Sequence, residues 1–203
     1  MTHRTGSFLR TTRETTIDLV LGLDGVLPTG REPGIAVPDG FFGHMLDALG
    51  RHGDLTISLA ASGDTHVDLH HTVEDVGIAF GEALGGALGD RAGVARFGHA
   101  YAPLDEALAR AVVDLSGRGF FVFEAPEAIA GSWVTQAFPF TLVADFFQAF
   151  ADRGRFTLHL GVLAGRNPHH AAEACFKAVA VALRGAVVRR GVEVPSTKGT
   201  LTA

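Results

Sequence analysis

Cysteine and long apolar runs are scarce in this sequence, and each scarcity excludes a class of protein. The single cysteine, Cys175, cannot form a disulfide within the chain, which favours a reducing compartment. No apolar run reaches the roughly 20 residues needed to span a bilayer, and the N-terminal stretch "MTHRTGSFLRTTRETT" has no apolar signal-peptide centre. We therefore expect a cytoplasmic protein with no membrane partner.

Positive charge is also in short supply. The 17 Lys and Arg residues are outnumbered by 22 Asp and Glu residues, and the formal net charge is −5. This balance argues against a nucleic-acid partner, because phosphate backbones are bound by basic surfaces. The chain has 203 residues, 47% of them hydrophobic and 19% charged, which is enough to bury a substantial core in a globular fold.

An internal repeat divides the sequence into two similar halves. The stretches "HHTVE" and "HHAAE" share the pattern His-His-x-x-Glu and lie 99 residues apart, beginning at His70 and His169. Upstream, "HMLDALGRHGDLTISL" from His44 aligns with "DFFQAFADRGRFTLHL" from Asp145. Further upstream, "ETTIDLVLGLDG" ending at Gly25 resembles "EALARAVVDLSG" ending at Gly117. We expect half-repeats at residues 7–92 and 93–192, followed by a tail at 193–203.

Each half has the same expected order of elements, which predicts the fold class. Alternating β-branched residues predict strands at 16–23 and 55–59, and the repeat requires a strand near 109–115. Helical spacing is found at 41–51, at 142–151 and after each histidine pair. We read 29–40 as a loop, and the tail as flexible unless a ligand or subunit holds it. The predicted fold is α+β, a duplicated β-β-α-β-α unit with two mixed sheets and four helices packed between them.

The histidine pairs are candidate metal ligands. Residues four apart on a helix share one face, so His70 with Glu74, and His169 with Glu173, can each offer nitrogen and oxygen to one ion. Neighbouring residues point about 100° apart, so the second histidine of each pair should serve a different ion. The repeat then predicts two symmetric sites, which can also be completed between subunits. One comprises His70, Glu74, His170 and Asp145; the other comprises His169, Glu173, His71 and His44.

The ligand types restrict the metal. Imidazole and carboxylate ligands without thiolate suit manganese, iron or zinc. Mixed nitrogen and oxygen ligands with open positions favour an octahedral, manganese-type site. A single His-x-x-x-Glu pair is usually a surface hydrogen bond, but two copies at equivalent points of a repeat favour metal binding.

Seven stretches together resemble one known family. They are "RTTRET", "FFGHMLDALGRHG", "GDTHVDLHHTVEDVGIAFGEAL", "RFGHAYAPLDEA", "DLSGR", "GRNPHHAAEACFKAVAVAL" and "PSTKGTL", which span nearly the whole chain in order. They resemble the imidazoleglycerol-phosphate dehydratase family, and the two His-His-x-x-Glu motifs with "STKG" are highly specific. The resemblance implies a duplicated fold, two manganese ions (Mn2+) per active site and a homo-oligomer, a 24-mer in the family. It also implies dehydration of imidazole-glycerol phosphate to imidazole acetol phosphate in histidine biosynthesis.

The resemblance also implies roles for individual residues. Metal positions match His44, His70, His71, Glu74, His169, His170 and Glu173, with Asp145 at a position that is often histidine. Glu14 matches the substrate-contacting glutamate and is our candidate acid or base. His52 lies within the family's substrate-binding segment. Phosphate and substrate contacts match Arg96, Arg118, Ser196, Thr197 and Lys198.

Four positions depart from the family's pattern and keep other functions open. Gly43 and Leu69 stand where aspartate is common, Gly119 replaces a proline, and Asp145 replaces a histidine. Loss of the aspartates could remove hydrogen bonds that orient ligands. The alternatives are a non-catalytic metal-binding oligomer, a paralogue acting on a related imidazole phosphate, and a binuclear hydrolase. The phosphate-binding tail argues against a storage role, and nothing in the sequence selects the hydrolase.

Overall fold

The computed structural model describes residues 3–201, and they form two four-stranded sheets, one from each half of the chain. The first sheet has the order β1-β2-β4-β3 and the second β5-β6-β8-β7. In each sheet two neighbouring pairs are antiparallel and the last pair is parallel, so both sheets are mixed. The strands are β1 (Thr5–Thr11), β2 (Thr15–Gly22), β3 (Gly34–Ala36), β4 (Thr56–Gly63), β5 (Phe97–Leu104), β6 (Ala107–Asp114), β7 (Phe120–Glu124) and β8 (Thr157–Ala164).

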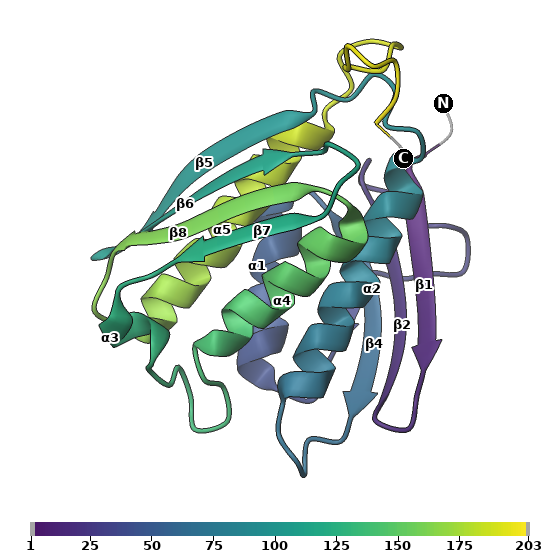
Figure 1. The fold of residues 1–203 in the computed structure, drawn as a ribbon. Helices are drawn as coiled ribbons and strands as arrows, with labels where there is room; N and C mark the ends of the chain where they lie inside the picture. The colour runs from purple at the N-terminus through teal and green to yellow at the C-terminus, as the bar shows by residue number, and fades with distance from the viewer. Residues whose placement is uncertain (1–2, 202–203) are drawn as a thin grey trace.

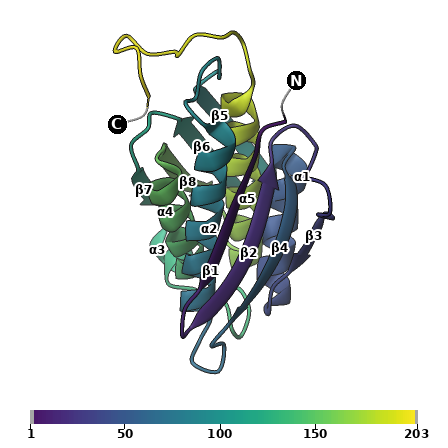
Figure 2. The same cartoon turned by 90° about the vertical axis from the view of Figure 1, so that its right-hand side faces the viewer.

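Four long helices lie between the two sheets, as Figures 1 and 2 show. Helix α2 packs on β1 and β2 of the first sheet, and α5 packs on β5 and β6 of the second. In the middle layer α2 contacts α4, and α1 contacts α5. The helices are α1 (Gly40–Gly53), α2 (His70–Leu88), α3 (Glu127–Ala130), α4 (Thr141–Gly154) and α5 (Pro168–Val187). The predicted α+β fold, with two mixed sheets around four helices, is confirmed.

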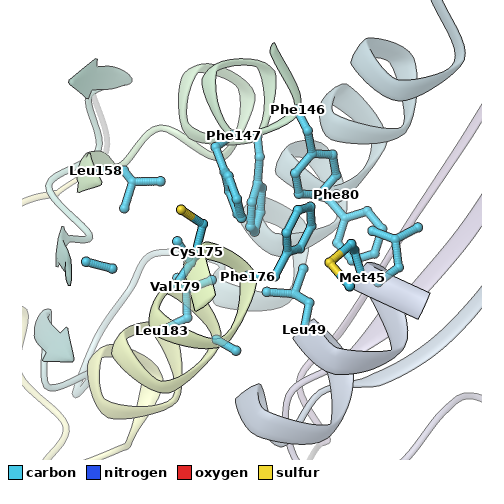
Figure 3. Close-up of a cluster of buried hydrophobic side chains, with 14 of the residues drawn as sticks. Met45, Leu49, Phe80, Phe146, Phe147, Leu158, Cys175, Phe176, Val179 and Leu183 are labelled. Atoms are coloured by element: carbon cyan, nitrogen blue, oxygen red, sulfur yellow. The ribbon is translucent and has the colours of Figure 1, made fainter. Parts of the chain in front are cut away.

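All four long helices contribute to the core (Figure 3). Met45 and Leu49 enter it from α1, Phe80 from α2, and Phe146 and Phe147 from α4. The ring of Phe176 on α5 lies 4.7 Å, centroid to centroid, from the ring of Phe147. Cys175 is fully buried there, and burial raises the pKa of its thiol.

Glycines let the helices approach the sheets closely at equivalent points. A Cβ at Gly6 in β1 would meet the carbonyl oxygen of Ala83 on α2, and one at Gly98 in β5 would meet that of Ala182 on α5. Gly98 follows Gly6 by 92 residues, the same offset that separates Gly25 from Gly117. The repeat is therefore visible in the packing as well as in the sequence.

The sequence-based prediction of individual elements is right for the four long helices and for the strands to which it gave residue ranges, and incomplete for the others. The predicted strand near 109–115 is β6, and the helices after the histidine pairs are α2 and α5. The segment 29–40, predicted as a loop, contains β3, and no residue range was predicted for β1, β5, β7 or α3. Each half therefore has an extra edge strand beside the parallel partner β4 or β8.

Residues 193–201 of the tail contact the rest of the protomer, whereas the sequence suggested that a ligand or another subunit would have to hold the tail. The backbone N–H of Gly93 donates to the carbonyl of Glu193 at 2.8 Å, and the guanidinium of Arg96 donates to the carbonyl of Pro195 at 2.8 Å. Leu201 is buried, and its carbonyl oxygen fills the space where a Cβ of Gly117 would stand. Within residues 3–201, no helix combines the length and apolar character that crossing a bilayer requires.

Candidate metal centre and active site

The first turns of α2 and α5 place the histidine pairs in the same way. Asp68 lies two residues before His70 and its carboxylate accepts the His70 N–H at 2.8 Å. Asn167 lies two residues before His169 and accepts the His169 N–H at 2.9 Å. These caps satisfy backbone donors that the helix itself leaves unpaired. Leu69, which stands where the family commonly has aspartate, is buried and makes no capping hydrogen bond. The cap of α2 comes instead from Asp68, one residue upstream.

One cluster joins α1 to the start of α5. The Glu173 carboxylate oxygen Oε2 lies 3.4 Å from Nε2 of His169 and 3.5 Å from Nε2 of His44. Its other oxygen accepts from the Lys177 ammonium at 2.6 Å. Burial raises the pKa of Glu173, but Lys177 and the two histidines outweigh it, and the pKa lies below the ordinary value. The carboxylate is therefore ionised and shared by two imidazoles.

A second cluster joins α4 to the start of α2 and is the repeat equivalent of the first. His70 has Nε2 4.0 Å from an oxygen of Glu74 and Nδ1 3.4 Å from an oxygen of Asp145. Burial raises the pKa of Asp145, and the charge of Glu74 acts in the same direction against the opposing effect of His70. A cation bound beside His70 would reduce the repulsion between the carboxylates of Glu74 and Asp145.

The second histidine of each pair is held by a different carboxylate. His71 Nδ1 lies 3.0 Å from Asp64 and 4.0 Å from Glu14, and Nδ1 of His170 lies 2.7 Å from Glu106. The hydrogen bond with His71 lowers the pKa of Asp64, and the same bond raises the pKa of His71. The hydrogen bond with His170, aided by backbone N–H groups, lowers the pKa of Glu106 to about 2.

Pairwise contacts therefore link three of the four ligands predicted for each site. His44 joins His169 and Glu173, and Asp145 joins His70 and Glu74, each pairing a residue of one half with the other half. The fourth members, His170 and His71, contact other carboxylates. Across residues 3–201 of one protomer, no three histidine, cysteine, aspartate or glutamate side chains stand close enough together to hold an ion. Completion of the sites between copies stays a prediction.

The donor set fits a divalent transition metal with mixed ligands. Each cluster offers imidazole nitrogen and carboxylate oxygen, and the chain's single thiol is buried in the core. The imidazoles of each pair have centroids 6.1 Å apart with nearly perpendicular rings, so neighbouring histidines face different directions. That each pair serves two ions stays a prediction.

The predicted phosphate contacts gather at the opposite end of the protomer. The C-terminal segment lies at the top of Figure 1, whereas α2 and α5 begin at the bottom. Arg96 bonds Pro195 in that segment, and Gly117, next to Arg118, touches Leu201. The Arg96 guanidinium also donates to Asp114 at 2.7 and 3.2 Å. Arg118, Thr197 and Lys198 are exposed, and Ser196 is half-buried.

The two remaining predicted residues lie at different ends. Glu14 sits in the turn between β1 and β2, beside His71, with its side chain 57% exposed. His52 is exposed in the last turn of α1, eight residues after His44, which places it about 12 Å further along the helix. The structure thus brings Glu14 to the histidines and does not bring His52 there.

Two functional candidates were missed by sequence reasoning. Asp64 and Glu106 bond the second histidines, but neither has a helical spacing that marks it. A signal for Glu106 was present, because the alignment of "ETTIDLVLGLDG" with "EALARAVVDLSG" pairs it with Glu14. Asp64 depends on the path of the loop after β4, which the sequence pattern does not define.

Two of the departures from the family's pattern have local steric explanations. A Cβ at Gly119 would stand 2.6 Å from the Cα of Asp152, so a proline would clash with the end of α4. A Cβ at Gly43 would stand 3.2 Å from a methyl of Val37, so an aspartate would require that valine to move. Both glycines therefore agree with their surroundings in this chain.

Comparisons with known proteins agree on one family. Residues 38–183 match the family described as imidazoleglycerol-phosphate dehydratase. The chain is 53% identical to imidazoleglycerol-phosphate dehydratase of Acidiphilium cryptum over 203 residues, covering 98% of this chain and 99% of the relative. It is 48% identical to that of Ruegeria pomeroyi over 203 residues, covering 98% of this chain and 100% of the relative.

Solved structures with the same name have a similar fold. The crystal structure of the Staphylococcus aureus imidazoleglycerol-phosphate dehydratase superposes with a TM-score of 0.76 at 33% identity, covering 91% of this chain and 99% of that one. The Pyrococcus furiosus structure, in complex with (S)-C348, gives a TM-score of 0.80 at 32% identity, covering 95% and 99%.

Proposed function

The chain belongs to the imidazoleglycerol-phosphate dehydratase family, and we propose that it dehydrates D-erythro-imidazole-glycerol phosphate with two manganese ions in each active site. The enzyme is a carbon–oxygen hydro-lyase of histidine biosynthesis. The product is imidazole acetol phosphate. The observation that supports the metal-dependent part is the pair of equivalent clusters, in which Glu173 meets two imidazoles and His70 meets two carboxylates.

The metal ligands would be the eight side chains at the starts of the helices. Bound manganese would supply Lewis-acid polarisation of the substrate's imidazole ring. Six of these ligands lie in the two clusters, and the other two are the second histidines, His71 and His170. These ligands are His44, His70, His71, Glu74, Asp145, His169, His170 and Glu173.

Glu14 is our candidate for proton transfer. It stands at the histidine end, its carboxylate is mostly exposed, and it lies 4.0 Å from His71 Nδ1. A carboxylate in that position can reach a substrate whose ring is bound by the neighbouring ligands. Proton transfer by a positioned side chain typically contributes about 10²–10⁴-fold to a rate.

Phosphate binding and oligomerisation are linked in this proposal. Arg96 bonds Pro195 of the C-terminal segment, which contains Lys198, and Gly117 beside Arg118 touches Leu201. That segment lies opposite the starts of α2 and α5 (Figure 1). A substrate bound at both its ring and its phosphate would therefore need the histidine end of one copy and the tail end of another. We propose a homo-oligomer, 24 subunits as implied by the family resemblance, whose active sites form between copies. A cytoplasmic location is part of the same proposal and is supported by the single buried cysteine, Cys175.

The deciding experiment is turnover of imidazole-glycerol phosphate by the purified protein with manganese. We expect formation of the ketone product and its loss after chelation of the metal. Full metal occupancy without turnover would refute the dehydratase and leave the metal-binding oligomer. In the variant Glu14→Gln we expect kcat to fall by about 10²–10⁴-fold while manganese affinity is retained. The matched variant Glu82→Gln, which changes an α2 surface carboxylate 3.8 Å from Arg153, should keep the wild-type rate.

A further inference from the structure

The two halves hold their second histidines with carboxylates from non-equivalent positions. Glu14 immediately precedes β2, and Glu106 immediately precedes β6, so the hairpin repeat makes them equivalent. Asp64 immediately follows β4, and the residue that immediately follows β8 is Gly165. Yet His71 is bonded by Asp64, and His170 is bonded by Glu106.

In the second half, Glu106 is fully engaged. One carboxylate oxygen accepts from the backbone N–H groups of Arg166 at 3.3 Å and Asn167 at 2.9 Å. The other oxygen lies 2.7 Å from Nδ1 of His170. The residue thus joins the loop that leads into α5 to the second histidine of that helix.

In the first half, Asp64 takes the equivalent role. Its carboxylate lies 3.0 Å from Nδ1 of His71 and is largely buried, and its backbone N–H donates to the carbonyl of Glu14. The Glu14 carboxylate is left 4.0 Å from the same nitrogen, beyond hydrogen-bond distance.

Loop length explains the difference. Residues 64–69 connect β4 to α2, whereas residues 165–167 connect β8 to α5. The pairing of β6 with β8 also shifts register between Leu108 and Ala109, next to Glu106. Gly165 has a φ of 151° and no side chain to offer, so the shorter connection relies on Glu106.

We infer that Asp64 and Glu106 are positioning residues for the metal-binding histidines His71 and His170, supplied from non-equivalent places in the two halves so that Glu14 stays available to the substrate. This inference rests on the proposed function. A carboxylate only accepts hydrogen bonds, so it fixes the imidazole proton on Nδ1 and leaves the Nε2 lone pair to bind metal. Both histidines thereby present the same nitrogen.

Replacement of Glu106 by glutamine tests the tautomer directly. The side-chain oxygen would keep the two backbone N–H donors, and the amide NH₂ would then face Nδ1 of His170. An amide donor there requires Nδ1 to accept, which moves the imidazole proton to Nε2 and blocks metal binding. Asp64→Asn makes the same change in the first half, where Oδ1 of Asp64 has no hydrogen-bond partner among residues 3–201, so the amide is held less firmly and the effect should be smaller.

The experiment is a manganese titration of the metal-free protein, followed by the electron paramagnetic resonance signal of free Mn2+. Wild type is compared with Glu106→Gln, Asp64→Asn, Glu14→Gln and the surface control Glu82→Gln. We expect about 10–100-fold weaker binding for Glu106→Gln, a smaller loss for Asp64→Asn, and affinity within about twofold of wild type for the other two. Light scattering checks that each variant assembles as wild type does, and Asp64→Asn carries the test where Glu106→Gln does not fold.

Turnover adds a second readout that separates positioning from catalysis. At saturating manganese, Glu106→Gln should regain most of its kcat, whereas Glu14→Gln should not. Unchanged manganese affinity in both Glu106→Gln and Asp64→Asn would overturn the inference, even where the wild type is an active dehydratase. Manganese binding by Glu14→Gln as weak as that of Glu106→Gln would overturn the separation of roles. A wild type that binds manganese without turnover would refute the proposed function, and the affinities of the variants would still decide the inference.

Discussion

The first strands of the two halves, β1 and β5, are preceded by equivalent arginines that use different carboxylates. The carbonyl of Arg4 accepts from Leu23, and that of Arg96 accepts from Leu115, both at 3.0 Å. The guanidinium of Arg4, however, pairs with Asp24, whereas that of Arg96 pairs with Asp114.

The repeat positions explain how this exchange arises. Ser116 is equivalent to Asp24, and Gly22 is equivalent to Asp114, so each half lacks the carboxylate that the other uses. Asp64 and Glu106 also come from non-equivalent positions, although there the first half keeps a carboxylate, Glu14, at the position equivalent to Glu106. The two halves make the same backbone hydrogen bonds because the sheet requires them. The carboxylate that pairs with an arginine, in contrast, can come from any position close enough to contact the guanidinium. The comparison teaches that backbone symmetry persists where side-chain symmetry does not.

The strongest test of backbone symmetry is to break it at one glycine at a time. Gly6→Ala and Gly98→Ala each drive a methyl group into a helix carbonyl, that of Ala83 or Ala182. Each should lower the free energy of unfolding by about 3 kcal/mol, and by the same amount within about 0.5 kcal/mol. Urea denaturation at fixed protein concentration measures this.

Gly85→Ala is the control for the glycine pair, because a Cβ there meets nothing within 4 Å. It should be neutral or raise stability by up to about 1 kcal/mol, since alanine favours helix. Clearly unequal losses for Gly6→Ala and Gly98→Ala would contradict the equivalence of the two helix–sheet contacts.

A medium effect is expected where the halves differ in a buried charge. Asp75 on α2 is buried, accepts from the Thr15 hydroxyl and lies 3.1 Å from Arg10, whereas the equivalent residue on α5 is Ala174. Asp75→Ala should cost about 2 kcal/mol, because it removes the carboxylate that accepts from the buried Thr15 hydroxyl and lies beside the Arg10 guanidinium. Thermal unfolding of that variant beside Asp75→Asn, which keeps an acceptor for Thr15, measures the difference. An unaltered melting temperature in Asp75→Ala would show that the first half does not depend on this contact.

The smallest expected effect is the pH dependence of the stability that the Arg4–Asp24 pair contributes. Its hydrogen bond with Arg4 lowers the pKa of Asp24 to about 2. A depressed folded-state pKa contributes stability above the ordinary value near 3.8, and that contribution is lost as pH falls through about 2. Asp24→Asn should cost about 1 kcal/mol at neutral pH, a figure reduced for solvent screening because the side chain is 35% exposed, and this cost should shrink as pH falls toward about 2.

Unfolding curves of wild type and Asp24→Asn between pH 7 and about 2 measure the convergence. Asp47→Asn serves as the control, because its partner Arg51 is 76% exposed and solvent screens an exposed pair of this kind. A constant gap between Asp24→Asn and wild type across that range would exclude the ionic origin of the difference.

Local periodicity predicted β2, β4 and the four long helices. The strand β6 is different, since its alanines suggest helix and only the repeat requires a strand. The short strand β3 was missed because it has three residues and pairs only through parallel contacts with β4, a partner that local sequence does not define. The helix α3, four residues long, was missed for a similar reason.

The candidate site divides in the same way. His70 with Glu74 and His169 with Glu173 were predictable from helical spacing, and the repeat predicted the additions of Asp145 and His44. Asp64 and Glu106 were not predicted, because their roles depend on the lengths of the loops that precede α2 and α5. The gathering of Arg96, Arg118 and Lys198 at the opposite end depends on the whole fold, which no single motif describes.

The distance between the histidine end and the tail end determines which active sites of an oligomer a substitution in one subunit would affect. If each reaction centre takes Glu14 from one copy and Lys198 from another, a subunit altered at one residue still contributes its intact end to a different centre. Two inactive variants, one altered at each residue, would then regain part of the rate when unfolded and reassembled together. Genetic complementation between alleles of a single gene is the expected consequence in a cell.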